Sequence, residues 1–347
     1  MQYSYFWLNG VFRSSLKRNS SYKTKVYSLE TVNFKQLKLV IEMSKNRNNN
    51  HFANELITVS LHKTKYMKSP EFINPELQNQ YEENGYVVIS NLLNAQEVEQ
   101  LKNLFEMNYG NVAQPGVLWN SLCDLPKDRS LTLSDRILAV IKPNLDKHMK
   151  NYMCPAATFL VKNPTPESVV HIHRDFSVQD EPNFSYQNVW LPLVDTSAQY
   201  GRLYVLKKSH KFFSYPLPHF TPWPYKEHEK LLSEYSEAID AKAGDLIIYG
   251  DKTLHGSTDN LTANPRPVVH FGLLHPESKF LYHYHNPETN EVTVYEVPYP
   301  FFFESAWGNQ DHRFPIFRKF QFDPPVITKE EIIEWLNTNV VETLATA

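Results

Sequence analysis

Residues 169–175 read Val-Val-His-Ile-His-Arg-Asp, a short extended stretch that contains three candidate metal ligands. In a β-strand, side chains two positions apart point to the same face, so we expect His173 and Asp175 to lie together while Arg174 points away. Imidazole and carboxylate groups are common ligands of divalent metals. The stretch therefore predicts a strand that carries part of a metal site. His171 falls on the same face, but the pattern gives it no ligand role.

A second stretch downstream supplies a third candidate ligand and an anion-binding side chain. Residues 244–249 are an apolar strand pattern, and His255 follows at the end of that pattern. His255 would complete a set of two histidines and one carboxylate, which holds non-haem Fe(II) and leaves coordination positions open for O₂. Further along, Arg266 begins another strand pattern, and its planar guanidinium can bind the distal carboxylate of 2-oxoglutarate bidentately. These residues predict an iron centre beside a 2-oxoglutarate site.

Short strand patterns separated by Pro, Asn, Gly and Asp dominate residues 71–276, which we expect to form one domain. The predicted strands are 86–89, 157–161, 169–175, 188–194, 203–206, 245–249 and 267–274. Helical patterns are few, namely one from Pro75 to the pair Asn84-Gly85 and one that Asn94 caps with Glu97 at its third position. This pattern favours a mainly β fold with flanking helices, an antiparallel sandwich or jelly roll, over an alternating α/β fold.

The segments on either side of this core differ from it. Residues 1–70 begin with a basic, acid-poor stretch, and we expect a disordered N-terminal extension. A transit peptide, or a true start of translation at Met43, are the alternatives. Residues 277–347 predict an extension packed on the core, made of a hairpin (280–297), an aromatic segment (298–303) and a terminal helix (330–336). The aromatic segment is expected either to cover a pocket or to form a small satellite core.

The composition argues against several classes of protein. The net charge is −3 and the basic residues do not gather in one motif, so the expected partner is a small molecule and not nucleic acid. No stretch is apolar over the length of a membrane span, so no membrane partner is expected. Cys123 and Cys154 are too few for a disulfide framework, which indicates a reducing compartment. We therefore expect a cytoplasmic protein, with organellar targeting by the basic N-terminus as the alternative.

The chain resembles the phytanoyl-CoA dioxygenase family of Fe(II)- and 2-oxoglutarate-dependent oxygenases over roughly residues 77–274. The resemblance rests on the metal strand and on the stretches Glu83-Asn84-Gly85-Tyr86-Val87-Val88, Asn188-Val189-Trp190-Leu191-Pro192-Leu193, Gly201-Arg202-Leu203-Tyr204-Val205-Leu206 and 244–266. It implies a double-stranded β-helix, which is a cupin-like jelly roll. It also implies that the catalytic iron ligands are His173, Asp175 and His255, and that the 2-oxoglutarate site contains Arg266, Ser257 and Trp190.

The resemblance further implies hydroxylation of a small organic molecule, with succinate and CO₂ as co-products. Related halogenases replace the carboxylate that Asp175 supplies here, so its presence favours hydroxylation, with desaturation or ring formation as the alternative outcomes. One departure is Lys207-Lys208, where the family often has Pro-Gly; a solvated basic loop is favoured there over an anion-attracting one. Two alternatives remain, namely a cupin-like metal enzyme that does not use 2-oxoglutarate, and a non-catalytic β-sandwich binding module. The first leaves Arg266 without a role.

Overall fold

The computed structural model describes residues 67–109, 117–181, 183–213, 215–303 and 313–341, together with five strands within the first 66 residues. The chain divides into two compact units, residues 1–66 and 67–347. The strands of the first unit are β1 (Ser4–Leu8), β2 (Val11–Ser15), β3 (Tyr22–Asn33), β4 (Gln36–Lys45) and β5 (Leu56–Ile57). The expected disorder of residues 1–70 and the alternatives for this segment stay predictions, because much of it lies outside the described residues.

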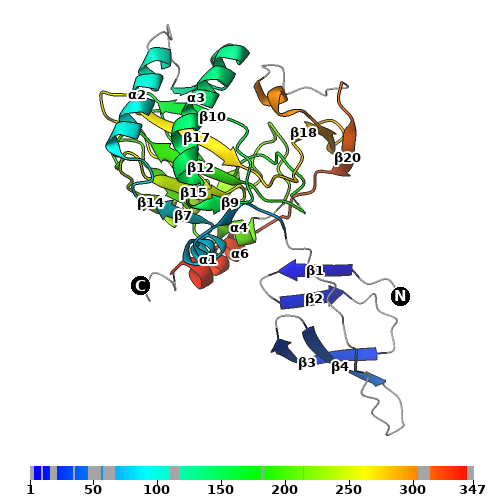
Figure 1. Cartoon of the computed structure of the whole chain (residues 1–347). Coiled ribbons are helices and arrows are strands. Elements are labelled where there is room, and N and C mark those ends of the chain that lie inside the picture. Colours follow the sequence, from blue (N-terminus) through cyan, green and yellow to red (C-terminus); the bar gives the residue numbers. More distant parts are fainter. Residues whose placement is uncertain are drawn as a thin grey trace. The chain divides into compact units, whose positions relative to one another are not determined.

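Two antiparallel sheets form the core of residues 67–347 (Figure 1). The larger sheet has the strand order β7-β15-β12-β17-β10-β8, and the smaller has the order β11-β16-β13-β14. The bounds of the larger sheet are β7 (Tyr86–Ile89), β15 (Leu246–Gly250), β12 (Gln187–Pro192), β17 (Arg266–Leu273), β10 (Ala157–Lys162) and β8 (Leu118–Asn120). Those of the smaller sheet are β11 (Val170–His173), β16 (His255–Ser257), β13 (Leu203–Val205) and β14 (Glu237–Ile239). This is the predicted double-stranded β-helix.

The two faces of the larger sheet have different roles because alternate side chains of a strand point to opposite faces. On β17, Val269, Phe271 and Leu273 belong to the same buried cluster as side chains of α2 and α3. Val268 instead joins the cluster between the two sheets, with Leu203 and Val205 of the smaller sheet. We call the second face the inner face. It carries polar residues among the apolar ones, and it is where the candidate site lies.

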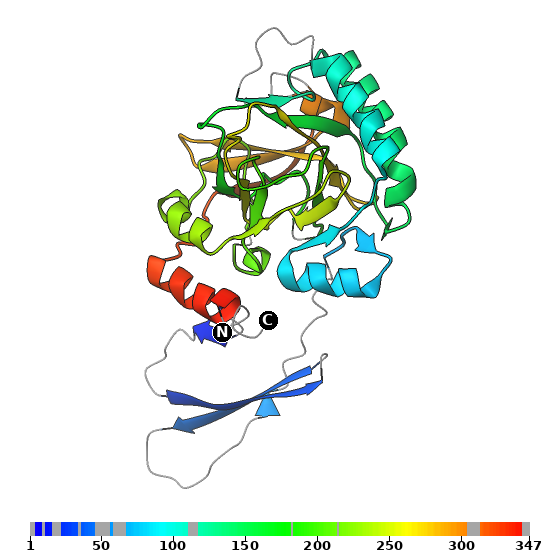
Figure 2. The ribbon, with the colours of Figure 1, turned by 90° about the vertical axis from the view of Figure 1, so that its left-hand side faces the viewer.

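Two helices, α2 (Ala95–Tyr109) and α3 (Lys127–Leu145), pack side by side against the outer face of the larger sheet (Figure 2). The helix α1 (Pro75–Asn84) lies apart from them and packs beside the edge strand β7. The predicted cap of α2 is present, because the Asn94 side chain accepts hydrogen bonds from two backbone N–H groups and the Glu97 carboxylate accepts one from the backbone of Asn94. The predicted end of α1 is also present, with Gly85 in the left-handed conformation at φ 84°.

The C-terminal region adds a three-stranded antiparallel sheet and a helix to this unit. Its strands are β18 (Leu281–Asn286), β19 (Glu291–Glu296) and β20 (Ile316–Gln321). β18 and β19 form the predicted hairpin, and α6 (Lys329–Leu336) is the predicted terminal helix, with a capping box between Thr328 and Glu331. The helix η2 (Tyr299–Phe303) occupies the aromatic segment. Its Phe301 is buried in a small cluster with Tyr282 and Tyr295, which is the predicted satellite core.

The remaining elements are short connections. They are β6 (Glu71–Phe72), β9 (Met149–Lys150), α4 (Ser209–Phe212), η1 (Lys226–His228), α5 (Glu229–Glu234) and η3 (Asn337–Val341). Cys123 and Cys154 are both free thiols. Among the described residues, no helix has the length and apolar character that crossing a membrane requires.

Candidate metal centre

Two neighbouring strands of the smaller sheet bring the three predicted ligands together. His173 at the end of β11 is the direct register partner of His255 at the start of β16, and the two ring centroids are 4.5 Å apart. The carboxylate oxygens of Asp175 lie 3.8 Å from Nε2 of His173 and 3.8 Å from Nε2 of His255. The candidate ligand atoms of the three residues are all within 4.8 Å of one another. A single divalent ion would fit between them.

Asp175 reaches this position in a different way from the predicted one. The expected strand over residues 169–175 ends at His173, and its register with β16 shifts between Val170 and His173. Asp175 therefore lies beyond the strand and not two positions along it. The Asn188 side chain holds Asp175 in place, because Nδ2 of Asn188 donates a hydrogen bond of 2.7 Å to the Asp175 carboxylate. Prediction from strand geometry alone was wrong on this point.

The hydrogen bonds of both histidines suit metal binding. Nδ1 of His173 lies 2.7 Å from the carbonyl oxygen of His171, and Nδ1 of His255 lies 2.9 Å from that of Thr253. A carbonyl can only accept, so each ring carries its proton on Nδ1 and presents the Nε2 lone pair to the metal position. Burial lowers the pKa of His255 to about 4, although Asp175 opposes this shift. His255 is thus neutral, which is the form that binds metals.

A pair of buried cations lies on the inner face of the larger sheet. Lys162 on β10 and Arg266 on β17 are direct cross-strand partners, and their relative exposures are 0% and 1%. Nζ of Lys162 donates to the hydroxyl of Ser257 at 2.6 Å and to the carbonyl of Thr258 at 2.6 Å. We call Lys162, Arg266 and Ser257 the cationic end of the site. Ser257 is two residues beyond His255, so this group adjoins the candidate metal ligands.

Arg266 has few partners for a buried guanidinium. Its Cζ lies 5.2 Å from the centre of the Trp190 ring, while its Nε and Nη1 have no hydrogen-bond partner. Burial lowers the pKa of Arg266 to about 9, and burial together with Arg266 lowers that of Lys162 to about 7. Among the described residues, neither cation has a carboxylate within ion-pairing distance. Two buried charges without a counter-ion are costly, and an anion bound between them would relieve that cost.

The backbone position beside Lys162 and Arg266 is a glycine, Gly201. Gly201 has φ 60°, in the left-handed region, and a Cβ added there would lie 3.0 Å from Cδ of Lys162 and 3.3 Å from Nε of Arg266. Both contacts are tighter than almost all real Cβ contacts. A glycine at this position therefore leaves the two cations undisturbed.

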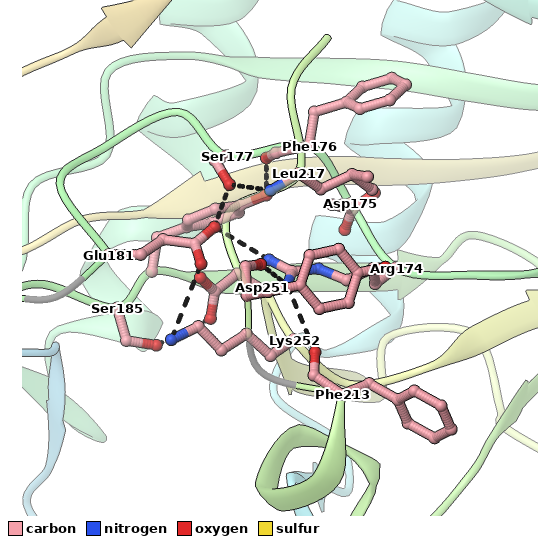
Figure 3. Close-up of polar contacts among 12 residues, drawn as sticks. Arg174, Asp175, Phe176, Ser177, Glu181, Ser185, Phe213, Leu217, Asp251 and Lys252 are labelled. Atoms are coloured by element: carbon pink, nitrogen blue, oxygen red, sulfur yellow. Dashed lines mark hydrogen bonds and ion pairs between the residues drawn. The ribbon is translucent and has the colours of Figure 1, made fainter. Parts of the chain in front are cut away.

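A second buried arginine, Arg174, has a carboxylate partner, unlike Arg266, although its Nε has no hydrogen-bond partner among the described residues (Figure 3). It is 2% exposed, its Nη2 forms an ion pair of 2.9 Å with Glu181, and its Nη1 donates to the carbonyl of Phe213 at 3.3 Å and to that of Tyr215. Its guanidinium also lies 5.3 Å from the centre of the Tyr215 ring. Arg174 points away from the metal position, as predicted, and joins a structural network.

Glu181 connects the Arg174 network to Ser177, which follows the metal strand, and to Lys252, which follows β15. It accepts a hydrogen bond from the hydroxyl of Ser177, and Lys252 lies 3.8 Å from its second oxygen. Asp251 accepts a hydrogen bond of 2.8 Å from Ser185, and burial raises the pKa of Asp251 to about 6. The network therefore fastens residues 174–185, which follow the metal strand, to the end of β15 (Figure 3).

The other residues considered from the sequence lie outside this site. The His171 side chain is mostly exposed and contacts Glu229. The predicted solvated basic loop is only partly exposed, and its lysines are ion-paired: half-buried Lys207 and Lys208 pair with Glu237 and Glu83, and exposed Lys211 also pairs with Glu83.

Sequence reasoning missed three residues of the site, namely Lys162, Asn188 and His270. His270 lies on the inner face, where its Nε2 is 3.4 Å from the hydroxyl of Tyr249, and burial lowers its pKa. A polar side chain inside an otherwise apolar strand is the signal that could have indicated Lys162 and His270.

Comparisons with known proteins agree with this geometry. The family described as Phytanoyl-CoA dioxygenase (PhyH) matches residues 81–268, which is just over half of the chain. No curated protein is significantly similar in sequence. Among solved structures, the α-ketoglutarate-dependent carbocyclase SnoK from nogalamycin biosynthesis is 18% identical, with a TM-score of 0.41 over 60% of this chain and 86% of SnoK.

Two further solved structures are similar to a comparable degree. The epimerase SnoN, in complex with Fe³⁺, α-ketoglutarate and nogalamycin RO, is 16% identical, with a TM-score of 0.44 over 70% of this chain and 98% of SnoN. HygX from Streptomyces hygroscopicus, with nickel and 2-oxoglutarate bound, is 17% identical, with a TM-score of 0.42 over 58% of this chain and 87% of HygX. On the match of the family over residues 81–268, the chain belongs to the phytanoyl-CoA dioxygenase family of Fe(II)- and 2-oxoglutarate-dependent oxygenases.

Proposed function

We propose that this oxygenase hydroxylates a small organic molecule, with Fe(II) bound by His173, Asp175 and His255 and with 2-oxoglutarate anchored at the cationic end. The observation that carries the proposal is the buried pair Lys162 and Arg266, which has no carboxylate within ion-pairing distance among the described residues and adjoins a group of three candidate metal-ligand side chains. A dicarboxylate can bind both features at once, because one carboxylate reaches the cations while its oxo-acid end faces the metal ligands.

The residues present fit Fe(II) and leave room for its other ligands. Two imidazoles and one carboxylate are the donor set that non-haem Fe(II) sites use, and such a set leaves coordination positions open. Asn188 fixes the carboxylate of Asp175, and the backbone carbonyls of residues 171 and 253 fix the two rings. Partners of this kind around metal ligands hold their orientation and raise their affinity for the metal.

The cationic end fits the distal carboxylate of 2-oxoglutarate. Nε and Nη1 of Arg266 have no hydrogen-bond partner among the described residues and can donate to a carboxylate, and the Trp190 ring holds the guanidinium in place. The Ser257 hydroxyl accepts its hydrogen bond from Lys162, so its own proton is free to point toward an anion. We therefore assign the anchoring of 2-oxoglutarate to Arg266 and Ser257, with Trp190 as the wall.

Bound Fe(II), with 2-oxoglutarate and O₂, supplies the oxidising chemistry that converts the cosubstrate to succinate and CO₂ and places one oxygen atom in a C–H bond of the substrate. The protein contributes orientation and the exclusion of water. The carboxylate of Asp175 supports hydroxylation as the outcome, because it occupies the ligand position that a halogenase leaves for chloride. Burial of Trp190, Arg266 and His255 keeps bulk water from the path between the cosubstrate and the metal.

The proposal is tested by adding Fe(II) and 2-oxoglutarate to the full chain without oxygen. A weak visible charge-transfer band is expected, and its absence in well-folded protein would contradict the proposal. With oxygen present, His255→Ala should abolish iron-dependent formation of succinate, because it removes a metal ligand. His285→Ala is the matched control, since His285 lies on the surface of the β18–β19 hairpin and should leave turnover unchanged.

The two alternatives give different results in the same experiment. A cupin-like metal enzyme that does not use 2-oxoglutarate would bind Fe(II) but would show no band on addition of the dicarboxylate. A binding module with structural histidines would show no tight Fe(II) binding, and His255→Ala would only alter its stability.

A further inference from the structure

A partly open, mainly apolar cavity of about 270 Å³ adjoins the candidate metal centre on the side opposite the cationic end. Asp175 and Asn188 form part of its wall, whereas neither Arg266 nor Lys162 belongs to its lining. On β17 the order along the inner face is Arg266, then His270, then Gly272, so the cationic end and the cavity lie at opposite ends of one strand. A molecule in the cavity would face the metal from one side while an anion approached it from the other.

We propose that this cavity is the substrate site and that it accepts an uncharged, mainly apolar ring compound. This inference rests on the proposed oxygenase function, because it takes the neighbouring Asp175 as a metal ligand. It names the chemical class of the substrate, which the family alone does not.

The charges of the lining support an uncharged substrate. Among the described residues that line the cavity, Asp175 is the only charged side chain, and none is a lysine or an arginine. A phosphate, a carboxylate or an ammonium group buried here would have no partner apart from the metal centre, which costs several kcal/mol or shifts the group to its neutral form. The phosphates of a coenzyme A ester would find no cation in this wall.

The polar atoms of the lining are largely committed to the protein. The Thr158 hydroxyl donates to the Asn120 side chain at 2.6 Å, and the Tyr186 hydroxyl donates to the carbonyl of Phe176 at 3.0 Å. Asn188 donates to Asp175, and His219 accepts from the backbone N–H of His283 at 3.4 Å. Burial lowers the pKa of His219 to about 3, so this ring is neutral as well. A substrate in the cavity would therefore contact mostly apolar surface.

Aromatic rings from outside the β-helix form part of the cavity wall. Phe280, Tyr299 and Phe302 come from the C-terminal region, with ring centroids of Phe280 at 5.2 Å from Tyr299 and at 6.3 Å from Phe302. Phe176, the residue after Asp175, stacks on His219 with centroids 5.4 Å apart. Flat walls of this kind favour planar or alicyclic rings, because aromatic faces gain most from offset stacking and edge contacts.

The volume of the cavity restricts the substrate further. Sites for drug-sized ligands typically measure about 300 to 1,000 Å³, so a cavity of about 270 Å³ lies just below that range. It suits a compact ring system. A long acyl chain or a large glycoside would have to leave most of its atoms outside.

The first test compares two probes of the same shape and different charge. 2-Naphthalenemethanol and 2-naphthoate are titrated into the full chain with Fe(II) and 2-oxoglutarate under nitrogen, and binding is followed by calorimetry. We expect the neutral alcohol to bind at least about tenfold more tightly than the carboxylate, because the lining cannot pair a charge. Equal binding of the two probes, or tighter binding of the carboxylate, would overturn the inference.

The second test places a larger side chain at Gly272, so that it fills part of the cavity. A Cβ added at Gly272 would meet only Cδ1 of Leu274, at 3.6 Å, which is an ordinary van der Waals contact. Gly272→Leu should therefore project into the cavity and weaken binding of 2-naphthalenemethanol at least about tenfold. Gly272→Ala is the matched control and should change the affinity by less than about threefold. An unchanged affinity in folded Gly272→Leu would show that the probe binds elsewhere.

A third variant keeps the inference testable if Gly272→Leu does not fold. Phe302→Ala removes one aromatic wall, so the larger neutral probe 9-anthracenemethanol should bind more tightly to it than to the natural chain. No gain in folded Phe302→Ala would count against the cavity as the binding site.

The same samples separate this inference from the proposed function. In Gly272→Leu the visible band with Fe(II) and 2-oxoglutarate should still form, because the cationic end is untouched. A band without any preference for the neutral probe would overturn the substrate class alone. A preference for the neutral probe without a band would overturn the 2-oxoglutarate site and leave the apolar cavity as a binding site.

Discussion

Two buried arginines flank the candidate metal centre, and their surroundings differ. Arg174 has a carboxylate partner in Glu181, two backbone carbonyls and an aromatic face. Arg266 packs on an aromatic face, but its Nε and Nη1 have no hydrogen-bond partner among the described residues, and the neighbouring cation is Lys162. A buried charge that is paired within the protein belongs to the fold, whereas one without a partner is held ready for a ligand. The two residues should therefore respond in opposite ways to mutation.

The largest effect is expected from breaking the paired arginine. Glu181→Gln leaves the Arg174 guanidinium buried without its counter-ion and should lower the free energy of unfolding by about 3 to 5 kcal/mol. Urea denaturation measures this change. Glu277→Gln is the control, because Glu277 forms an exposed ion pair with Lys68 that contributes at most about 1 kcal/mol. A similarly small loss of unfolding free energy in Glu181→Gln and Glu277→Gln would show that the ion pair of Arg174 does not stabilise the fold.

The opposite result is expected for the arginine without a partner. Arg266→Met should raise the dissociation constant of 2-oxoglutarate at least about 30-fold, since it removes the bidentate donor. Its stability should stay the same or increase, because an unpaired buried charge is lost. Titrating the visible band with 2-oxoglutarate measures the first change and urea denaturation the second. Arg202→Met, which removes a surface arginine paired with Asp240, should leave the affinity unchanged.

A smaller effect is expected for the second cation. Lys162→Met should weaken 2-oxoglutarate binding by about tenfold, because the ammonium group acts through charge and through Ser257, without a bidentate contact. The same titration of the visible band measures it. A loss as large as that of Arg266→Met would show that the two cations contribute equally, and no loss would leave Lys162 as a purely structural residue.

The smallest effect is a pH dependence that belongs to the cationic end alone. Lys162 has a pKa of about 7, lowered by burial and by Arg266, while Asp259 opposes the shift. A bound carboxylate raises this pKa, so binding takes up a proton above pH 7. The affinity for 2-oxoglutarate should then fall as pH rises from about 7, by at most tenfold per pH unit. Arg266 stays protonated to about pH 9. Lys162→Met should flatten this profile, and an unchanged slope would assign it to another group.

The sequence predicted the parts of the fold in which local patterns and tertiary packing agree. The strands β7, β10, β11, β12, β13, β15 and β17, the Asn94 cap and the left-handed Gly85 all have strong local signals. The strands β8, β14 and β16 were not predicted, because a strand of three residues carries only a weak local pattern. Helix α3 was missed although Leu133, Ile137 and Ile141 repeat at helical spacing, because Pro143 lies inside it and its first turns are polar. Tertiary packing against β10 and α2 decides this helix more than its propensity.

For the site, motif spacing indicated which side chains meet but not how they are held. His173, Asp175 and His255 come together, yet the strand ends before Asp175, and Asn188 supplies the contact that orients it. Lys162 could not be placed because the pairing of β10 with β17 is a long-range register that no local pattern specifies. The partner of Arg174 was not predicted either, because Glu181 lies in the irregular segment 174–181, whose conformation no local pattern specifies.

The aromatic wall of the cavity comes from residues 280–302, beyond the stretch 81–268 that matches the family. Mutations in that wall can accumulate without touching the ligands of the metal or the clamp for the cosubstrate. Evolution could therefore exchange one substrate for another in this lineage while the oxidative machinery is inherited unchanged. A natural or engineered chimera that swaps only the C-terminal region is the expected route to a new specificity.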